Sequence, residues 1–227
     1  MALFDTPRVP EAEAGFEPEE VERCASAAAL RHLETLDDEM VERALALGVD
    51  SGLVLAVGSG CGQIPIKLAL GNPSFIIHGL DASDALLRRA ALDAARWDVD
   101  LRILLNKWEA ASLPYDGGLF DLVLSDSLLR RVADPVSLIR EMSRVCKPGG
   151  ALLLRDLLRP NRLALRRHLR TYGRHYEGKM RELFEASVRA SYTVRELEAL
   201  AGRSGVAALE VRRMGPAHLG FERARAR

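Results

Sequence analysis

The chain has 227 residues, of which 48% are hydrophobic and 28% charged, and its 32 basic side chains balance its 32 acidic ones. These values are typical of a globular protein with one domain, or one domain and an extension, that buries a core without disulfides. They argue against a nucleic-acid-binding protein, which would carry a basic excess overall.

Three cysteines stand far apart in the sequence and form no CxxC or Cys/His cluster. This usage predicts no structural metal site and a reducing, cytoplasmic location. The acidic N-terminus lacks a basic start followed by an apolar core, so we expect no signal peptide. No apolar run is long enough to span a membrane, and we expect no membrane partner. The oligomeric state is expected to be a monomer or a homodimer.

The balanced total charge hides an asymmetry along the chain. Residues 1–50 contain 13 Asp/Glu against 4 Arg, a net charge of about −9, and residues 155–189 contain 10 Arg/Lys against 4 Asp/Glu, about +6. The two segments could be solvated helical faces or could pack together. Alternatively, the basic segment forms a cap that attracts an anionic substrate.

The N-terminal part predicts an arm followed by helix. Residues 1–18 contain three prolines and several glutamates, which favours a loose arm. Apolar residues recur at helical spacing over 19–47, so we expect one broken or two short helices that end at Gly48. Residues 1–48 would therefore precede a domain that spans 49–227.

Strands and helices alternate after that point. A branched apolar run at 53–57 predicts a buried strand, followed by a glycine turn and a helix with Pro65 in its first turn. Further strands are expected at 75–79, 101–105, 120–125 and 150–155, with helices at 84–96 (capped by Ser83) and 135–146. This order predicts an α/β doubly wound parallel sheet with right-handed crossovers.

A mostly helical, arginine-rich insertion at about 157–190 breaks this rhythm. Within it, Tyr172, Tyr176, Met180 and Phe184 repeat at four-residue spacing, which predicts one helical face. The alternation then resumes with a helix after Thr193 and strands at 207–212 and 217–223.

The glycine turn narrows the choice of ligand. A phosphate loop needs Lys and Ser/Thr after its last glycine, and neither follows Gly62. A dinucleotide site needs GxGxxG, whereas Gln63 holds the third glycine position here. The GxGxG spacing suits a ligand that lays an amino-acid group on the turn. Asp81, after the second strand, either caps the next helix or accepts hydrogen bonds from both hydroxyls of a ribose.

Together these motifs resemble the class I S-adenosylmethionine-dependent methyltransferases, of the small-molecule kind called methyltransferase type 11. The resemblance covers roughly residues 50–156 and is carried by Val54–Gly62, Gly79-Leu80-Asp81, Leu113-Pro114-Tyr115, Phe120-Asp121-Leu122-Val123 and Lys147-Pro148-Gly149-Gly150. It implies a Rossmann-like sheet of seven strands with an antiparallel last strand. It also implies transfer of a methyl group from S-adenosylmethionine to a small-molecule acceptor.

The resemblance implies a set of cofactor contacts. Gly58, Ser59 and Gly60 would face the methionine part, Asp81 the ribose, Ala82, Trp108, Glu109 and Ala110 the adenine, and Ser125 the sulfonium. Two positions depart from the family pattern. Ala56 stands where an acidic residue usually helps to hold the cofactor's amino group, and Arg130-Arg131 replace one or two histidines. A catalytically weak accessory or regulatory protein that binds the cofactor is therefore the alternative.

The acceptor side is less well defined by the sequence. The sulfonium supplies most of the reactivity, so no elaborate catalytic group is required. Asp126, just past the fourth strand, is the best-placed carboxylate for a general base, or else it is a cap. We expect the insertion to form a lid over the methyl group. Candidate contacts to an acceptor, which could be anionic, are Arg130, Arg131, Arg166, Arg167 and Tyr172.

Overall fold

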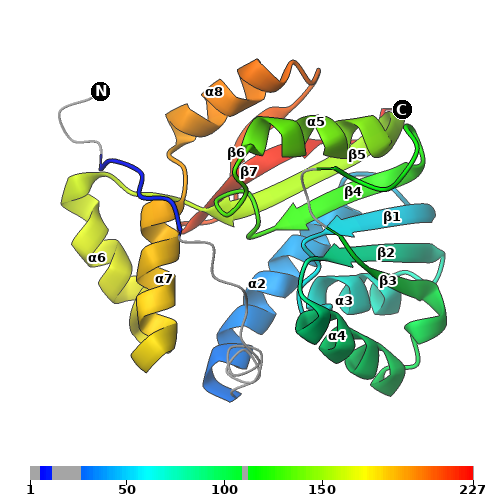
Figure 1. Cartoon of the computed structure of the whole chain (residues 1–227), viewed down its shortest axis with the longest axis horizontal. Coiled ribbons are helices and arrows are strands. Elements are labelled where there is room, and N and C mark those ends of the chain that lie inside the picture. Colours follow the sequence, from blue (N-terminus) through cyan, green and yellow to red (C-terminus); the bar gives the residue numbers. More distant parts are fainter. Residues whose placement is uncertain (1–5, 12–26, 109–111, 227) are drawn as a thin grey trace.

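The structure is a computed structural model that describes residues 6–11, 27–108 and 112–226. Seven strands form one sheet in the order β3-β2-β1-β4-β5-β7-β6 (Figure 1). The first five strands pair in parallel, and β7 runs antiparallel to both β5 and β6. The predicted α/β sheet of seven strands with an antiparallel last strand is confirmed.

The strands are β1 (Gly52–Val57), β2 (Phe75–Asp81), β3 (Ile103–Lys107), β4 (Phe120–Asp126), β5 (Cys146–Leu157), β6 (Glu210–Arg213) and β7 (His218–Arg223). The helices are α2 (Ala27–Leu45), α3 (Gln63–Gly71), α4 (Asp84–Arg96), α5 (Pro135–Val145), α6 (Arg162–Tyr172), α7 (Gly178–Ala190) and α8 (Val194–Ser204). Short 3₁₀ turns cover Asp100–Arg102 and Gly173–His175.

Alternating side chains along the strands point into two apolar layers, one on each face of the sheet. Val54 and Ala56 of β1 point to the layer formed with α2 and α3, whereas Leu55 and Val57 point to the layer formed with α5 and α8. A strand buried on both faces reads as a continuous apolar run, which is why residues 53–57 could be recognised in the sequence. Because β1 to β5 run parallel, their carboxyl ends lie along one edge of the sheet, where ligands bind in doubly wound folds.

Two strand starts differ from the prediction for local reasons. Residues 100–102 form a 3₁₀ turn that leaves Leu101 93% exposed, so β3 begins only at Ile103. Ala208 takes a left-handed conformation with φ of 59°, which interrupts the extended backbone before β6 begins at Glu210. Apolar side chains alone do not make a strand when the backbone turns.

The helical insertion has a defined neck. Leu158, just past β5, pairs with Tyr192 in an isolated bridge, so the insertion leaves and re-enters the domain at one place. The prediction of one continuous helical face is wrong, because the 3₁₀ turn and Gly178 (φ of 51°) separate α6 from α7. Tyr172 therefore lies on α6, whereas Phe184 lies on α7 and contacts Tyr176.

Candidate functional site

The glycine turn after β1 is held against the end of β2. The backbone N–H groups of Gly58 and Ser59 both donate to the carbonyl of Leu80, at 2.8 and 2.9 Å. Gly58, Gly60 and Gly62 all have positive φ, at 72°, 56° and 78°. A side chain at Gly62 would meet Ala90 of α4 at 2.7 Å, but one at Gly60 would meet nothing within 4 Å. Gly62 thus serves packing, and Gly60 faces open space.

Asp81 is oriented by two backbone groups. Its Oδ2 accepts from the N–H of Gly60 at 2.9 Å, and its Oδ1 accepts from the N–H of Ser83 at 2.9 Å. Ser83 itself caps α4 by accepting from Leu86. The Asp81 carboxylate is half-buried and keeps free lone pairs on both oxygens. It joins the glycine turn to the start of α4 and can accept further hydrogen bonds from a ligand.

Ser59 carries an unusual hydroxyl. Its Oγ is buried, and no residue in the described part of the chain forms a hydrogen bond with it. An unpaired buried hydroxyl costs free energy and indicates a partner from outside the described residues. The open space at Gly60 lies one residue away. The turn therefore fits a ligand that carries polar groups.

The residues expected at the adenine lie beside Asp81. Ala82 is exposed in the turn that follows β2. The Trp108 N–H donates to the Asp81 carbonyl at 3.0 Å, and its indole N–H donates to the carbonyl of Ser112. Trp108 as a whole residue is 43% exposed. Glu109 and Ala110, expected next to it, lie outside the described residues.

Ser125 ends the buried part of β4 opposite β1. Its Oγ donates to the carbonyl of Val57 at 2.8 Å, directly before the glycine turn. Ser125 and Val57 are also register partners in the parallel pair. Ser125 is thus next to the glycine turn, and its hydroxyl is engaged within the sheet.

Asp126 is not the free carboxylate that the sequence suggested. Its Oδ1 accepts from Arg155 Nε of β5 at 2.7 Å. Burial by itself would raise the pKa of Asp126, but the charge and hydrogen bond of Arg155 outweigh it and hold the pKa below its ordinary value. A carboxylate with a lowered pKa is a poor proton acceptor at neutral pH.

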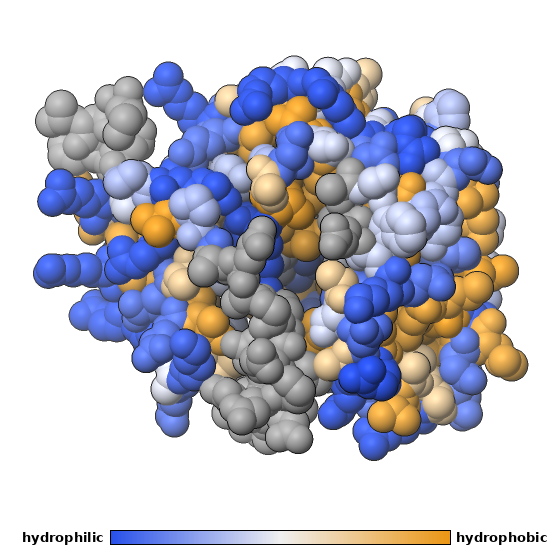
Figure 2. Space-filling view, viewed as in Figure 1, coloured by the Kyte–Doolittle hydropathy of each residue, from blue (hydrophilic) through white to orange (hydrophobic). Residues whose placement is uncertain are grey.

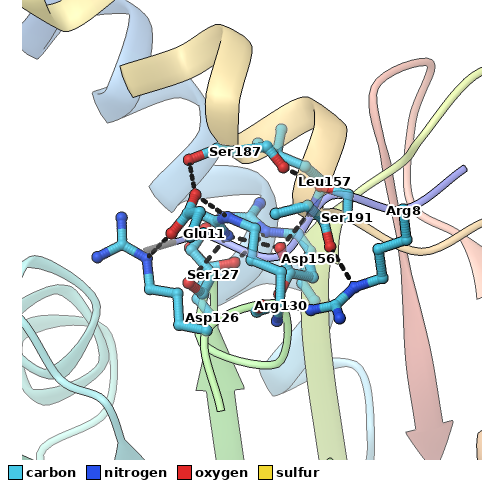
Figure 3. Close-up of polar contacts among 12 residues, drawn as sticks. Arg8, Glu11, Asp126, Ser127, Arg130, Asp156, Leu157, Ser187 and Ser191 are labelled. Carbon is cyan, nitrogen blue, oxygen red and sulfur yellow. Dashed lines mark hydrogen bonds and ion pairs between the residues drawn. The ribbon is translucent and has the colours of Figure 1, made fainter. Parts of the chain in front are cut away.

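Arg130 is also engaged within the protein (Figure 3). It is 5% exposed, and its Nη1 donates to Asp156 Oδ1 at 2.5 Å. Glu11 contacts both Arg130 Nε at 3.3 Å and Arg131 Nε at 3.1 Å. The expectation that Arg130 is available to an anionic acceptor therefore fails, because two carboxylates already neutralise its guanidinium.

The N-terminal arm, residues 6–11, lies over the loop that follows β4. Arg8 donates to the carbonyls of Ala190 and Arg130 at 2.6 and 2.7 Å, and its guanidinium lies 4.5 Å from the ring centre of Tyr192. Glu11 also accepts from Ser187 of α7. The arm thus connects the insertion with the carboxyl edge of the sheet, as expected if the acidic and basic segments pack together.

The insertion arginines lie on the outer side of α6. Leu165, His168 and Leu169 are buried, whereas Arg166 and Arg167 are exposed on the opposite side. Figure 2 shows hydrophilic side chains projecting along the edge that α6 and α7 form. Tyr172 is half-buried and packs near His168, with ring centres 4.7 Å apart. Arg166 and Arg167 are therefore not brought together with Arg130.

Sequence reasoning missed Asp37 of α2. Burial raises its pKa to about 7, and the neighbouring charge of Asp126 adds to the shift. The signal was present, since Asp37 stands three residues before Met40 and four before Val41, in the apolar stripe of α2. A carboxylate in such a stripe either packs at its end or has a function.

Within the described ranges, no helix is long and apolar enough to cross a membrane. The same ranges contain no group of three His, Cys, Asp or Glu side chains that could hold a metal ion.

Comparison with known proteins identifies the central part of the chain. Residues 55–154 match the family described as Methyltransferase domain. The chain is 34% identical over 105 residues to 27-O-demethylrifamycin SV methyltransferase of Amycolatopsis mediterranei, covering 46% of this chain and 38% of that protein. It is 30% identical over 123 residues to demethylmenaquinone methyltransferase of Roseiflexus castenholzii, covering 54% and 50%. The chain thus spans half or less of the length of these two relatives.

A solved structure shows the same fold over nearly the whole chain. A SAM dependent methyltransferase from Aquifex aeolicus superposes with a TM-score of 0.66 at 17% identity, covering 92% of this chain and 98% of that one. The strand order, the glycine turn and the matched family agree with one another. Residues 55–154 therefore match a methyltransferase domain, and the chain shares the fold of the Aquifex aeolicus structure.

Proposed function

We propose that this protein transfers a methyl group from S-adenosylmethionine to a small-molecule acceptor. The observation that carries the proposal is the glycine turn, where the buried Ser59 hydroxyl has no partner among the described residues and Gly60 faces open space beside Asp81. This arrangement fits an amino-acid group on the turn and a ribose at the carboxylate. Both relatives have names that describe small organic acceptors.

Each part of the site would have a separate task. The Ser59 hydroxyl and the turn N–H groups would hold the methionine part, and Asp81 would accept hydrogen bonds from the ribose hydroxyls. Trp108 would stack on the adenine, next to Ala82, Glu109 and Ala110. The cofactor supplies the activated methyl carbon when bound. The protein would then align the acceptor over Ser125 and exclude water from it.

The insertion would cover the acceptor. In this proposal residues 1–48 are an arm and helix, and residues 49–227 form the methyltransferase domain with its lid at about 157–190. The neck at Leu158 and Tyr192 supports a lid that moves as one piece. Because Arg166 and Arg167 are exposed, they could attract an anionic acceptor only from a distance. Exchanging both for Gln should then lower acceptor affinity at low salt only.

Calorimetry with S-adenosylmethionine and S-adenosylhomocysteine tests the cofactor assignment. We expect the chain to bind both, and Asp81→Ala to bind them at least tenfold more weakly, because a charge-assisted contact to the ribose is lost. Mass spectrometry of a metabolite extract incubated with protein and cofactor should show a product heavier by one methylene. If neither ligand binds, the proposal fails.

A second function is favoured by the loop after β4. There Asp126 and Arg130 are both ion-paired within the protein. A site without a free base could belong to an accessory or regulatory protein that binds the cofactor and catalyses weakly. Tight cofactor binding with no methylated product from any extract would favour this function.

A further inference from the structure

Asp37 lies where α2 reaches the carboxyl edge of the sheet. Met40, Val41 and Ala44 of α2 pack in the same apolar layer as Ala56 of β1. Asp37 precedes Met40 by three residues, so it continues that stripe by one helical turn. This turn of α2 lies near the end of β5, because Arg155 Nη1 of β5 donates to the carbonyl of Leu36 at 2.5 Å. Asp37 thus lies towards the carboxyl edge, on the side of the sheet that Ala56 faces.

The elements packed around Asp37 place it near the glycine turn. Its charged neighbours are Asp126 of β4, Arg155 of β5, Lys67 of α3 and Asp38 of its own helix. Asp126 follows Ser125, the register partner of the residue before the glycine turn. Helix α3, which carries Lys67, begins directly after that turn. Asp37 is therefore held between the end of β4 and the helix that leaves the turn.

The neighbouring cations are already paired with other groups. Arg155 binds Asp126 at 2.7 Å, and Lys67 binds Asp38. No hydrogen bond or ion pair to the Asp37 carboxylate is made by any residue within 6–11, 27–108 or 112–226. A half-buried carboxylate with a like charge beside it and no cation of its own is unfavourable. The raised pKa of Asp37, about 7, reflects that environment.

A cationic ligand would relieve this cost. S-adenosylmethionine carries an ammonium group on its methionine part, which lies at the glycine turn in the proposed function. Ala56 is 1% exposed and provides no charge on that side of β1. We propose that Asp37 binds the ammonium group of the cofactor and supplies from α2 the negative charge that Ala56 does not. This inference rests on the proposed function, because it requires the cofactor to occupy the turn.

The test uses three ligands that share the adenosine part. S-adenosylmethionine and S-adenosylhomocysteine both carry the ammonium group, whereas 5′-methylthioadenosine lacks it. Calorimetry should show that Asp37→Asn binds the first two ligands about tenfold or more weakly and binds the third with unchanged affinity. The variant is isosteric, and unchanged binding of 5′-methylthioadenosine would show that the ribose site remains folded.

Asp38→Asn is the matched control. Asp38 is the next residue on α2, is exposed, and pairs with Lys67. It carries the same charge, so a general electrostatic effect of α2 would appear in both variants. We expect Asp38→Asn to bind all three ligands within about twofold of the unmodified chain, because it makes no contact with the ammonium group.

The possible outcomes separate the two proposals. If the unmodified chain binds none of the three ligands, the proposed function fails and this inference fails with it. If it binds them and Asp37→Asn binds them equally well, only this inference fails. A loss of affinity for S-adenosylmethionine alone would place Asp37 at the sulfonium and would also overturn this inference. Equal losses for the two amino-acid ligands, with 5′-methylthioadenosine unaffected, support it.

Discussion

Glu11 Oε1 lies 3.3 Å from Arg130 Nε, although the two residues are 119 positions apart. Arg130 is bound on its other side by Asp156 of β5, and both of these side chains are at least 95% buried. The arm, the loop after β4 and the end of β5 are thus joined by one charge network (Figure 3). This network holds the edge of the sheet on which the proposed site is built.

Replacing Arg130 with Met should destabilise the protein more than its size suggests. The change leaves Asp156 buried without its cation, which costs about 3–5 kcal/mol of unfolding free energy. Replacing Asp156 with Leu as well removes the unpaired charge, so the double variant should recover part of the loss. Denaturant unfolding of both single variants and the double variant measures the coupling. Strictly additive losses would contradict a paired interaction.

Gly60 and Gly62, the last two glycines of the turn, should respond differently to replacement by alanine. Gly62→Ala places a methyl group 2.7 Å from Ala90, at a left-handed residue, and should lower the unfolding free energy by about 2–4 kcal/mol. Gly60→Ala meets no neighbour and should cost only about 1–2 kcal/mol of left-handed strain. Gly60→Ala should still bind S-adenosylhomocysteine more weakly, because the added methyl group enters the space that the ligand would occupy.

Denaturant unfolding and calorimetry on the same two preparations check this contrast. Gly62→Ala, studied under conditions where it is folded, should retain much of its ligand affinity. The assignment of tasks within the turn is contradicted if Gly60→Ala binds S-adenosylhomocysteine as tightly as the unmodified chain. It is also contradicted if both variants lose the same stability.

Those elements whose signals are local could be predicted from the sequence. The apolar run of β1, the Ser83 cap and the Thr193 capping box each depend on neighbours within a few residues. The order of such elements was sufficient to predict the parallel sheet, whereas the antiparallel last strand was implied by the family resemblance.

Interactions between distant elements could not be predicted in this way. Arg130 was a candidate contact for an anionic acceptor because it replaces a family histidine after β4, whereas Asp156 and Glu11 reach it from two other segments. Asp126 was a candidate base because it lies at the end of β4, but Arg155 of β5 forms an ion pair with it. Sequence periodicity reports burial along one element, but the partner of a buried charge depends on where two elements meet.

His218 should make the protein sensitive to mild acid. It is 6% exposed at the start of β7, and burial together with the charge of Arg155 lowers its pKa to about 4, despite the opposing effect of Asp126. An unfolded histidine has a pKa of about 6.5. The unfolded state therefore binds the proton more readily, so stability is complete above pH 6.5 and is lost as the pH falls towards 4.

A His218→Gln variant measures this contribution. It cannot titrate, so its unfolding free energy should fall by about 2–3 kcal/mol less than that of the unmodified chain between pH 7 and pH 4.5. Other titrating groups act on both proteins alike and cancel in the difference. A difference between the two proteins that is the same at both pH values would refute the assignment.

Asp37 should have the opposite pH dependence, because it is an acid whose folded pKa is raised. Its pKa is about 7 in the folded protein, compared with 3.8 for an ordinary aspartate. The folded state binds the proton more readily, so stability is complete below about pH 4 and is lost as the pH rises through 7. Asp37→Asn should therefore nearly match the unmodified chain near pH 4 and exceed its unfolding free energy by about 3–5 kcal/mol at pH 8.

S-adenosylhomocysteine should reduce the difference in unfolding free energy between Asp37→Asn and the unmodified chain if Asp37 binds its ammonium group. A ligand that binds only the folded state stabilises it by RT ln(1 + [L]/Kd), so S-adenosylhomocysteine should stabilise the unmodified chain more than Asp37→Asn. Thermal unfolding at pH 8, with and without 1 mM ligand (about 1 mM suffices for a Kd of about 10 μM), measures both effects. If Asp37→Asn is not more stable than the unmodified chain at pH 8 without ligand, the Asp37 carboxylate does not destabilise the free protein. A carboxylate that lowers stability in the free protein and raises it in the complex has the behaviour expected of a ligand contact, because folding alone gives no reason to keep it there.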